Sequence, residues 1–182
     1  ELEVQGAASP IDTTLSTFGG MIYLSNNPQK IVQLPINLEL PLVIGHTIRE
    51  GNTAELVESV RVKKENYPSI INPLLKSIQE ITEEARKALM DKDEEKLGEL
   101  MNINQGLLDA LGINTQKLSQ MIYLARENGA LGSKITGAGG GGSIIAYCPG
   151  KLDEVLYALG SIEQAFPVEL SQEGVKTKIK KN

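Results

Sequence analysis

The residues of this sequence best suited to chemistry lie in a glycine-rich run, KITGAGGGGS, at positions 134–143. Four successive glycines cost backbone entropy, which a folded chain tolerates where positive φ or a close backbone approach is required. The segments on both sides are apolar and β-branched, so they predict two strands and make a flexible interdomain linker the weaker interpretation. The bare amides of such a loop can surround an anion, and phosphate chemistry is therefore the leading hypothesis.

The glycine run also matches a dinucleotide-binding pattern. Gly137, Gly139 and Gly142 fit G-x-G-x-x-G. That pattern has to open a helix, whereas residues 143–148 favour a strand. The Walker-type pattern G-x-x-x-x-G-K-[ST] does not occur in the sequence. We therefore interpret the run as an anion-binding loop between two strands.

A second candidate is Asp12, which lies in a predicted loop of small residues, QGAASPIDTT, at positions 5–14. A lone Asp in such a loop is most often a turn or capping residue. A carboxylate held there is also what a kinase needs to orient an attacking hydroxyl and accept its proton, because positioning and electrostatics dominate phosphoryl transfer. Because the same chain carries a glycine-rich anion loop, we interpret Asp12 as the candidate base.

Three other polar residues have structural interpretations. Asn104 interrupts the apolar face of a predicted helix, so it either ties helices together, the interpretation we place first, or points at a ligand. His46 is the only histidine, which excludes a catalytic His pair and favours a structural role. Cys148 is the only cysteine, so no internal disulfide can form, and its strand-like surroundings predict a small core residue.

Periodicity predicts the elements that position these residues. Apolar runs predict strands at 20–24, 30–32 and 40–44, and helical spacing predicts helices from Asn52, over about 71–90, over 93–111 and over 115–128. A hairpin around the glycine run, a helix after Pro149–Gly150 and strands at 166–170 and 175–179 complete the chain. This order predicts an α+β, ferredoxin-like split βαβ unit with a helical block, its helices laid on one face of an antiparallel sheet.

Composition excludes several classes of protein. The 182 residues, 41% hydrophobic and 23% charged, can bury a sizeable core, which excludes a disordered or fibrous chain. The net charge of −5, from 18 basic and 23 acidic residues, argues against nucleic acid as a partner. No run of 18 apolar residues occurs, so we expect a cytoplasmic protein without a membrane partner. The chain has no initiator Met, and we interpret it as a fragment.

Together, these residues resemble the family of small-molecule kinases that includes galactokinase, homoserine kinase, mevalonate kinase and phosphomevalonate kinase. Residues 134–143 look like the third, glycine-rich motif of that family, and residues 5–12 look like the loop with its catalytic aspartate. The closest likeness is to archaeal mevalonate kinases, through VQGAASPID at 4–12, STFGG at 16–20, NTAELV at 52–57 and MNINQGLL at 101–108. The resemblance implies the end of an N-terminal, ribosomal S5-like domain at 1–38 and a C-terminal kinase domain at 39–182.

The resemblance also implies roles for individual residues. The reaction would transfer the γ-phosphate of ATP to the 5-hydroxyl of mevalonate, a step of isoprenoid biosynthesis. Asp12 would be the catalytic base, and Glu1 would hold the Mg²⁺ that bridges the ATP phosphates. The residues implied in nucleotide binding are Gly137, Ala138, Gly139 and Gly140. Those implied in substrate binding are Ser9, Thr53, Asn104 and Ala138.

The sequence departs from the family at several positions. Pro10 follows Ser9 where many relatives have Gly, and Ser143 stands where many have Cys. Gly51 precedes Asn52–Thr53 where an Arg is expected, so the role of the nearby Arg49 stays unassigned. The family's phosphate loop and its lysine near the attacked hydroxyl are both missing from the sequence. The implied partner is therefore an N-terminal half of the same protein, and the chain alone should not turn over; a homodimer is implied by analogy.

Two other functions stay open. One is a kinase of the same family that acts on another small alcohol. A phosphorylated substrate would need a basic cluster, and the sequence around Asp12 and Thr53 shows none, which favours mevalonate. The other is a non-catalytic, metabolite-binding fragment. A protein that has lost its catalytic activity has no chemical need for a carboxylate at position 12, so the presence of Asp12 argues against a non-catalytic fragment.

Overall fold

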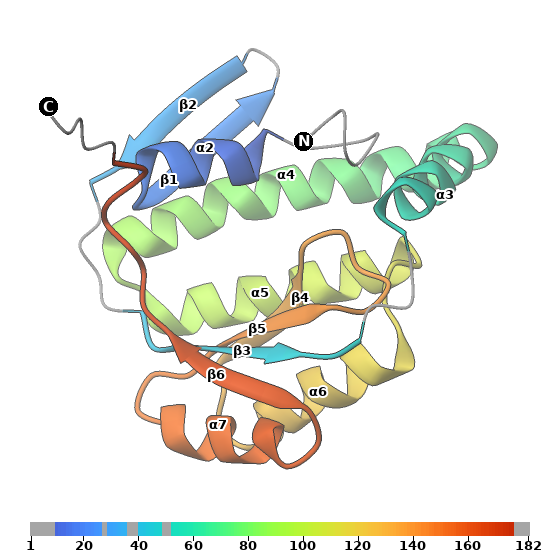
Figure 1. The fold of residues 1–182 in the computed structure, drawn as a ribbon. Coiled ribbons are helices and arrows are strands. Elements are labelled where there is room, and N and C mark those ends of the chain that lie inside the picture. The colour runs from blue at the N-terminus through green and yellow to red at the C-terminus, as the bar shows by residue number, and fades with distance from the viewer. Residues whose placement is uncertain (1–9, 27–28, 36–39, 49–51, 177–182) are drawn as a thin grey trace, which may run out of the picture.

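The structure is a computed structural model that describes residues 10–26, 29–35, 40–48 and 52–176. Figure 1 shows the elements of these residues. The helices are α2 (Ile11–Phe18), α3 (Thr53–Asn66), α4 (Pro68–Asp91), α5 (Glu94–Ala110), α6 (Gln116–Glu127) and α7 (Leu152–Gly160). The strands are β1 (Met21–Asn26), β2 (Gln29–Leu34), β3 (Leu42–His46), β4 (Gly132–Thr136), β5 (Ser143–Tyr147) and β6 (Gln164–Val168).

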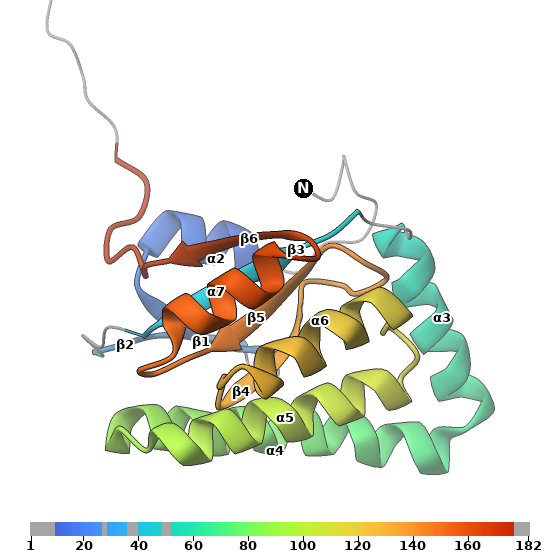
Figure 2. The ribbon, with the colours of Figure 1, turned by 90° about the horizontal axis from the view of Figure 1, so that it is seen from below.

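The larger sheet has four strands in the order β4-β5-β3-β6, and every neighbouring pair is antiparallel. Chain order and sheet order together are those of the predicted split βαβ unit, so the predicted α+β fold is confirmed. The helices, however, do not all lie on one face. α6 and α7 cover one face of the sheet, whereas α5 runs beside the edge strand β4 and α4 packs on α5 (Figures 1 and 2).

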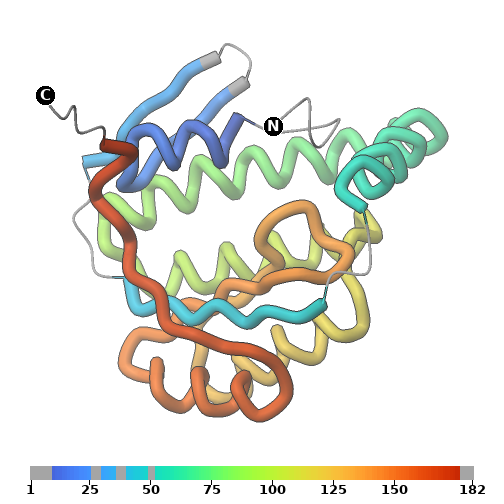
Figure 3. The backbone as a smooth tube through the Cα atoms, viewed as in Figure 1, coloured from blue at the N-terminus to red at the C-terminus, as the bar shows by residue number. Residues whose placement is uncertain are grey.

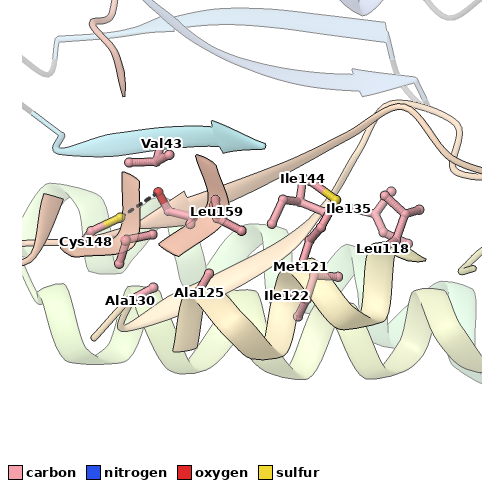
Figure 4. Packing of buried hydrophobic residues seen from close by; sticks show 12 residues of the cluster. Val43, Leu118, Met121, Ile122, Ala125, Ala130, Ile135, Ile144, Cys148 and Leu159 are labelled. Atoms are coloured by element: carbon pink, nitrogen blue, oxygen red, sulfur yellow. Dashed lines mark hydrogen bonds between the residues drawn. The ribbon is translucent and has the colours of Figure 1, made fainter. Parts of the chain in front are cut away.

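The hydrophobic core lies between the sheet and the helices α6 and α7. Val43 and Ile144 from the sheet meet Leu118 and Met121 from α6 and Leu159 from α7, all buried (Figure 4). These residues alternate along the strands and recur at helical spacing along the helices, which is why one face of each element is buried. Cys148 belongs to this core, as predicted, and burial raises the pKa of its thiol to about 11.

Side-chain caps explain where three helices begin. The Asn52 side chain accepts a hydrogen bond of 2.9 Å from the backbone N–H of Ala54 at the start of α3. Asp93 caps α5 in the same way, and Thr115 caps α6. Each cap satisfies one of the N–H groups that a helix start leaves without a partner. The helices predicted from positions 52, 93 and 115 are therefore confirmed within one residue.

Two predicted elements at the ends of the chain are wrong. Asp12 lies in the first turn of helix α2 and not in a loop. The hydroxyls of Thr13 and Thr14 donate to the carbonyl of Pro10, at 3.0 and 2.6 Å, so the polar groups of both β-branched side chains are satisfied within the first turns of the helix. At the other end, Val175 is not in a strand, and residues 177–179 of that predicted strand lie outside the described residues.

The strands β1 and β2 form a separate two-stranded antiparallel sheet. The Tyr23 hydroxyl donates to the Glu83 carboxylate on α4, and the Arg86 guanidinium lies 5.6 Å from the centre of the Tyr23 ring. The Glu83 carboxylate raises the pKa of Tyr23. These contacts attach the hairpin to α4. The predicted domain boundary between residues 38 and 39 falls between the two sheets and stays a prediction.

Side-chain amides of α5 occupy the outer edge of β4. The Asn102 amide donates to the carbonyl of Leu131 at 2.9 Å and accepts from the N–H of Ser133 at 3.1 Å. The Gln105 carbonyl accepts from the N–H of Ile135 at 2.8 Å. Arg126 donates to the carbonyl of Ser133 at 2.7 Å. These side chains give the edge strand the hydrogen bonds that a neighbouring strand would supply, as buried backbone groups require.

Replacing Gln105 by Met is expected to destabilise the fold, because the N–H of the buried Ile135 would lose its acceptor. An unsatisfied buried donor costs about 1–3 kcal/mol of unfolding free energy. The measurement is urea denaturation of the variant beside Gln120→Met, which changes an exposed glutamine on α6 and should stay within about 0.5 kcal/mol of the unmodified chain. Equal stability of the two variants would contradict a structural role for the Gln105 amide.

Candidate active site

The glycine-rich loop connects β4 to β5, and the last paired residues before it are Thr136 and Ser143. Positive φ angles occur at five of its six positions, and only glycine adopts them at little cost. These positions are Gly137 (78°), Gly139 (83°), Gly140 (68°), Gly141 (105°) and Gly142 (82°). The glycine run is therefore required by a tight, left-handed backbone path, as predicted, and it is not a flexible linker.

Three elements hold this loop in place. A Cβ built on Gly139 would lie 2.3 Å from the carbonyl oxygen of Ile113, in the turn between α5 and α6. The N–H of Gly140 donates to the same carbonyl at 2.8 Å. A Cβ on Gly140 would lie 2.7 Å from the Leu56 side chain of α3. The N–H of Thr47, just after β3, donates to the carbonyl of Gly142 at 2.8 Å.

The first turn of α3 lies against the loop through the Leu56–Gly140 contact. Thr53 is the first residue of this helix, and its side chain is half-buried. The free N–H groups and the positive end of the helix dipole favour an anion at this position. A Cβ on Gly137 or Gly142 would meet nothing within 4 Å, so there is open space beside the loop backbone. The structure thus places the helix that begins at Thr53 against the predicted loop residue Gly140.

Lys134 is a cation at the start of the loop that sequence reasoning did not assign to the site. It lies on the opposite face of β4 from the buried residues Ser133 and Ile135. Its ammonium group donates to the carbonyl of Ile135 at 2.7 Å, and burial lowers its pKa. A lysine in a predicted strand, three residues before the first glycine of the run, is the sequence signal that could have indicated it.

His46 and Ser143 are paired across β3 and β5 where the loop ends. The Nδ1 atom of His46 and the hydroxyl of Ser143 lie 2.9 Å apart, at hydrogen-bond distance. Together with the Thr47–Gly142 bond, this contact attaches the end of the loop to β3. The arrangement agrees with the structural role expected for His46.

Asn104 and Gln105 are both buried in α5, but they differ in their contacts. Gln105 ties α5 to β4, as described above. The Asn104 side chain makes no hydrogen bond with any described residue, although it is only 9% exposed. The residue that joins two elements is therefore Gln105 and not Asn104. A substrate-binding role for Asn104 stays a prediction.

Asp12 lies in the first turn of α2, and its side chain is exposed. Within the described part of the chain, no hydrogen bond or ion pair engages its carboxylate. α2 packs on β1, and its N-terminal end is directed towards the side of the molecule that carries α3 (Figure 1). That Asp12 and the glycine-rich loop belong to one active site stays a prediction. Glu1, Ser9 and Arg49 lie outside the described residues.

Two searches of the described residues gave negative results. Nowhere in residues 10–26, 29–35, 40–48 and 52–176 do three His, Cys, Asp or Glu side chains gather as a metal site would require. Within these ranges, no helix has the length and apolar character needed to span a membrane.

Lys63 links α3 to the turn that supports the loop. Its ammonium group donates to the carbonyl of Leu111 at 2.5 Å, two residues before Ile113. Lys63→Met is expected to lower the unfolding free energy by about 1.5–3 kcal/mol, because a charge-assisted hydrogen bond to a helix C-terminus is lost. Thermal denaturation next to Lys64→Met, which changes an exposed neighbour, measures this effect. A Lys63→Met variant as stable as Lys64→Met would show that the link carries no stability.

Comparison with known proteins gives a family for this chain. Residues 85–162 match the family model "GHMP kinases C terminal". The chain is 47% identical, over 175 residues, to the mevalonate kinase of Methanothermobacter thermautotrophicus, covering 96% of this chain and 57% of that protein. It is 49% identical, over 183 residues, to the mevalonate kinase of Thermococcus gammatolerans, covering 97% and 54%. The chain thus spans about half the length of the curated relatives it matches.

Solved structures agree with this similarity. The crystal structure of L. major mevalonate kinase in complex with R-mevalonate superposes with a TM-score of 0.82 at 27% identity, covering 94% of this chain and 55% of that one. The Methanococcus jannaschii mevalonate kinase superposes with a TM-score of 0.74 at 32% identity, covering 93% and 53%. The family resemblance predicted from the sequence is confirmed: this chain is a homologue of mevalonate kinases, and its residues 85–162 match the C-terminal domain of the GHMP kinases.

Proposed function

We propose that the protein containing this chain transfers the γ-phosphate of ATP to the 5-hydroxyl of mevalonate. The observation that carries the proposal is the identity of 47–49% to mevalonate kinases over 96–97% of the chain. ATP is the co-substrate that membership of the GHMP kinase family implies. The product, 5-phosphomevalonate, would serve isoprenoid biosynthesis, and we propose the cytoplasm as the location.

The geometry of the loop supports phosphoryl transfer. The loop backbone is fixed by Ile113, Leu56 and Thr47, and the first turn of α3 lies beside it. In the proposed site, the amides of Gly137, Ala138, Gly139 and Gly140 and the N-terminus of α3 face the phosphates. Fixed N–H dipoles stabilise the charge of the transferring group without having to reorganise during the reaction.

In the proposed reaction, Asp12 receives the proton of the mevalonate hydroxyl. The oxygen of that hydroxyl forms a bond to the γ-phosphorus while the bond between this phosphorus and the ADP oxygen breaks. The exposed carboxylate of Asp12 has no hydrogen-bond donor among the described residues, so its oxygens are free to accept this proton. Ser9, Thr53, Asn104 and Ala138 are the proposed substrate contacts.

Mg²⁺ is the proposed metal, held partly by Glu1. Asp12 and Thr53 are the oxygen donors that the described residues would add in this proposal, and no cluster of three His, Cys, Asp or Glu side chains occurs among those residues. Hard oxygen donors are the ligands that Mg²⁺ prefers, so the donor set fits this ion. When bound, the ion would offset the negative charge of the phosphates.

We also propose that residues outside this chain supply the main nucleotide-binding loop. The curated relatives are about twice as long, and the sequence carries no phosphate loop of its own. An N-terminal half of the same protein, placed before the predicted domain of residues 39–182, is the proposed partner. A homodimer is proposed by analogy with relatives.

The test is ADP formation by the full-length protein with ATP and, in turn, mevalonate, phosphomevalonate, galactose or homoserine. We expect turnover with mevalonate at least about tenfold above that with the other three, since a site built to pair substrate polar groups rejects alcohols that leave them unpaired. Faster turnover of another alcohol would assign that substrate instead. Mevalonate binding without ADP formation would make the chain part of a non-catalytic binding protein.

A further inference from the structure

The chain after β6 returns to the first helix. We call residues 169–176 the return segment. It leaves the end of β6 in the four-stranded sheet and runs to the α2–β1 junction, as Figures 1 and 3 show in red. The two ends of the described chain, more than 150 positions apart in sequence, are thereby joined.

Two backbone hydrogen bonds attach the return segment to this junction. The N–H of Gly20, directly before β1, donates to the carbonyl of Ser171 at 2.7 Å. The N–H of Val175 donates to the carbonyl of Ser16, in the last turn of α2, at 2.9 Å. The second bond satisfies a carbonyl that the end of a helix leaves without an intrahelical partner.

The two backbones also touch through a pair of glycines. A Cβ on Gly174 would lie 2.1 Å from the carbonyl oxygen of Thr17, and a Cβ on Gly19 would lie 2.4 Å from the carbonyl carbon of Glu173. Real Cβ atoms do not approach backbone atoms this closely, so any side chain at either position forces α2 and the return segment apart. Gly174 does not have a positive φ. Glycine is therefore required there because a side chain has no room, and not because of the backbone angle.

We propose that the return segment sets the position of α2 against the four-stranded sheet, and that Gly174 is a positioning residue for Asp12. The inference rests on the proposed role of Asp12 as the base. From Gly174 the connection runs along the return segment into β6, which pairs with β3, and the Thr47 bond then joins the end of β3 to the glycine-rich loop. The base and the phosphate loop are thus held by one continuous backbone path.

This path matters because the other neighbours of α2 belong to a different part of the fold. α2 packs on β1, and β1 pairs with β2 in the separate hairpin that Tyr23 attaches to α4. Among the described residues, the strands of the hairpin are not paired with the four-stranded sheet. A displacement of a reacting group by about 1 Å can cost about 100-fold in rate, so a direct tie between α2 and this sheet has a catalytic consequence.

The test compares Gly174→Ala with Gly160→Ala in the full-length protein. Gly160 ends α7, and a Cβ there would meet nothing within 4 Å. For Gly174→Ala we expect kcat to fall about 10–100-fold while the KM values for ATP and mevalonate stay within about twofold, because the base and not the binding loop is displaced. Amide hydrogens of α2 should exchange at least about tenfold faster. Gly160→Ala should change none of these quantities.

A second variant removes the tie at the donor of its second hydrogen bond. Val175→Pro deletes the N–H that donates to Ser16, at a residue whose side chain is 71% exposed. It should reproduce the faster exchange in α2 and the lower kcat even where Gly174→Ala disturbs folding. Unchanged exchange of α2 in the folded variants would overturn the inference.

Combination with Asp12→Asn separates the positioning role from a general loss of stability. If Gly174 acts through Asp12, the double variant should be no slower than Asp12→Asn alone. If instead the double variant loses kcat by the product of the two single losses, the positioning role is overturned. If Asp12→Asn alone leaves turnover intact, the proposed role of Asp12 fails, and positioning of the base fails with it. Hydrogen exchange still decides in that case whether the return segment holds α2.

Discussion

Asp12→Asn in the full-length protein is expected to lower kcat by about 10²–10⁴-fold, the usual contribution of a positioned proton acceptor. The substitution keeps the size of the side chain and removes its ability to take the proton from the hydroxyl. The fold should lose little, because the carboxylate is exposed and makes no hydrogen bond with a described residue. Loss of a negative charge in the first turn of α2 should cost about 0.3–1 kcal/mol.

The chain offers a closely matched control for this experiment. Asp153 is also exposed and also occupies the second position of a helix, α7. Asp153→Asn should show the same small change in stability and no change in kcat. The measurement is steady-state kinetics with mevalonate and ATP on both variants, together with their thermal unfolding. Equal activity of the two variants would remove Asp12 from the chemistry.

Gly139→Ala is expected to destabilise the chain by about 2–4 kcal/mol, the range of strongly destabilising core changes. Two costs combine at this position. The φ of 83° is unfavourable for any residue with a Cβ, and that Cβ would collide with the carbonyl oxygen of Ile113. Relief of the collision would move the loop away from the α5–α6 turn and break the Gly140–Ile113 hydrogen bond.

Gly137→Ala separates these two costs. Gly137 has nearly the same φ, 78°, but a Cβ there would meet nothing within 4 Å. It should therefore show the conformational cost alone, about 1–2 kcal/mol. Urea denaturation of both variants gives the two free energies. A difference between them of less than about 0.5 kcal/mol would show that the close approach to Ile113 does not hold the loop.

Local signals predicted the parts of the fold that local chemistry determines. The caps at Asn52, Asp93 and Thr115 have their partner N–H groups within three residues, so the helix starts could be placed from the sequence. The glycine run predicted its own hairpin. α2 was missed because small and β-branched residues with a preceding proline also suit a loop, and nothing local distinguishes the two.

Contacts between distant segments could not be predicted from one sequence. The loop at residues 137–142 depends on Ile113 and Leu56, and nothing in the local pattern names these two partners. The buried amides of α5 gave a partial signal. They indicated that a polar side chain in this helix has a partner, but only the structure shows that the bonds to β4 come from Asn102 and Gln105.

The amides of α5 also restrict how this protein can associate with others. A free sheet edge is a template for strand addition from a second molecule. At β4 the outward-facing groups of Leu131, Ser133 and Ile135 already have partners within the chain. At the opposite edge, β6 carries Pro167, which has no N–H to offer. Strand addition from a second molecule is thereby disfavoured at both edges of the four-stranded sheet.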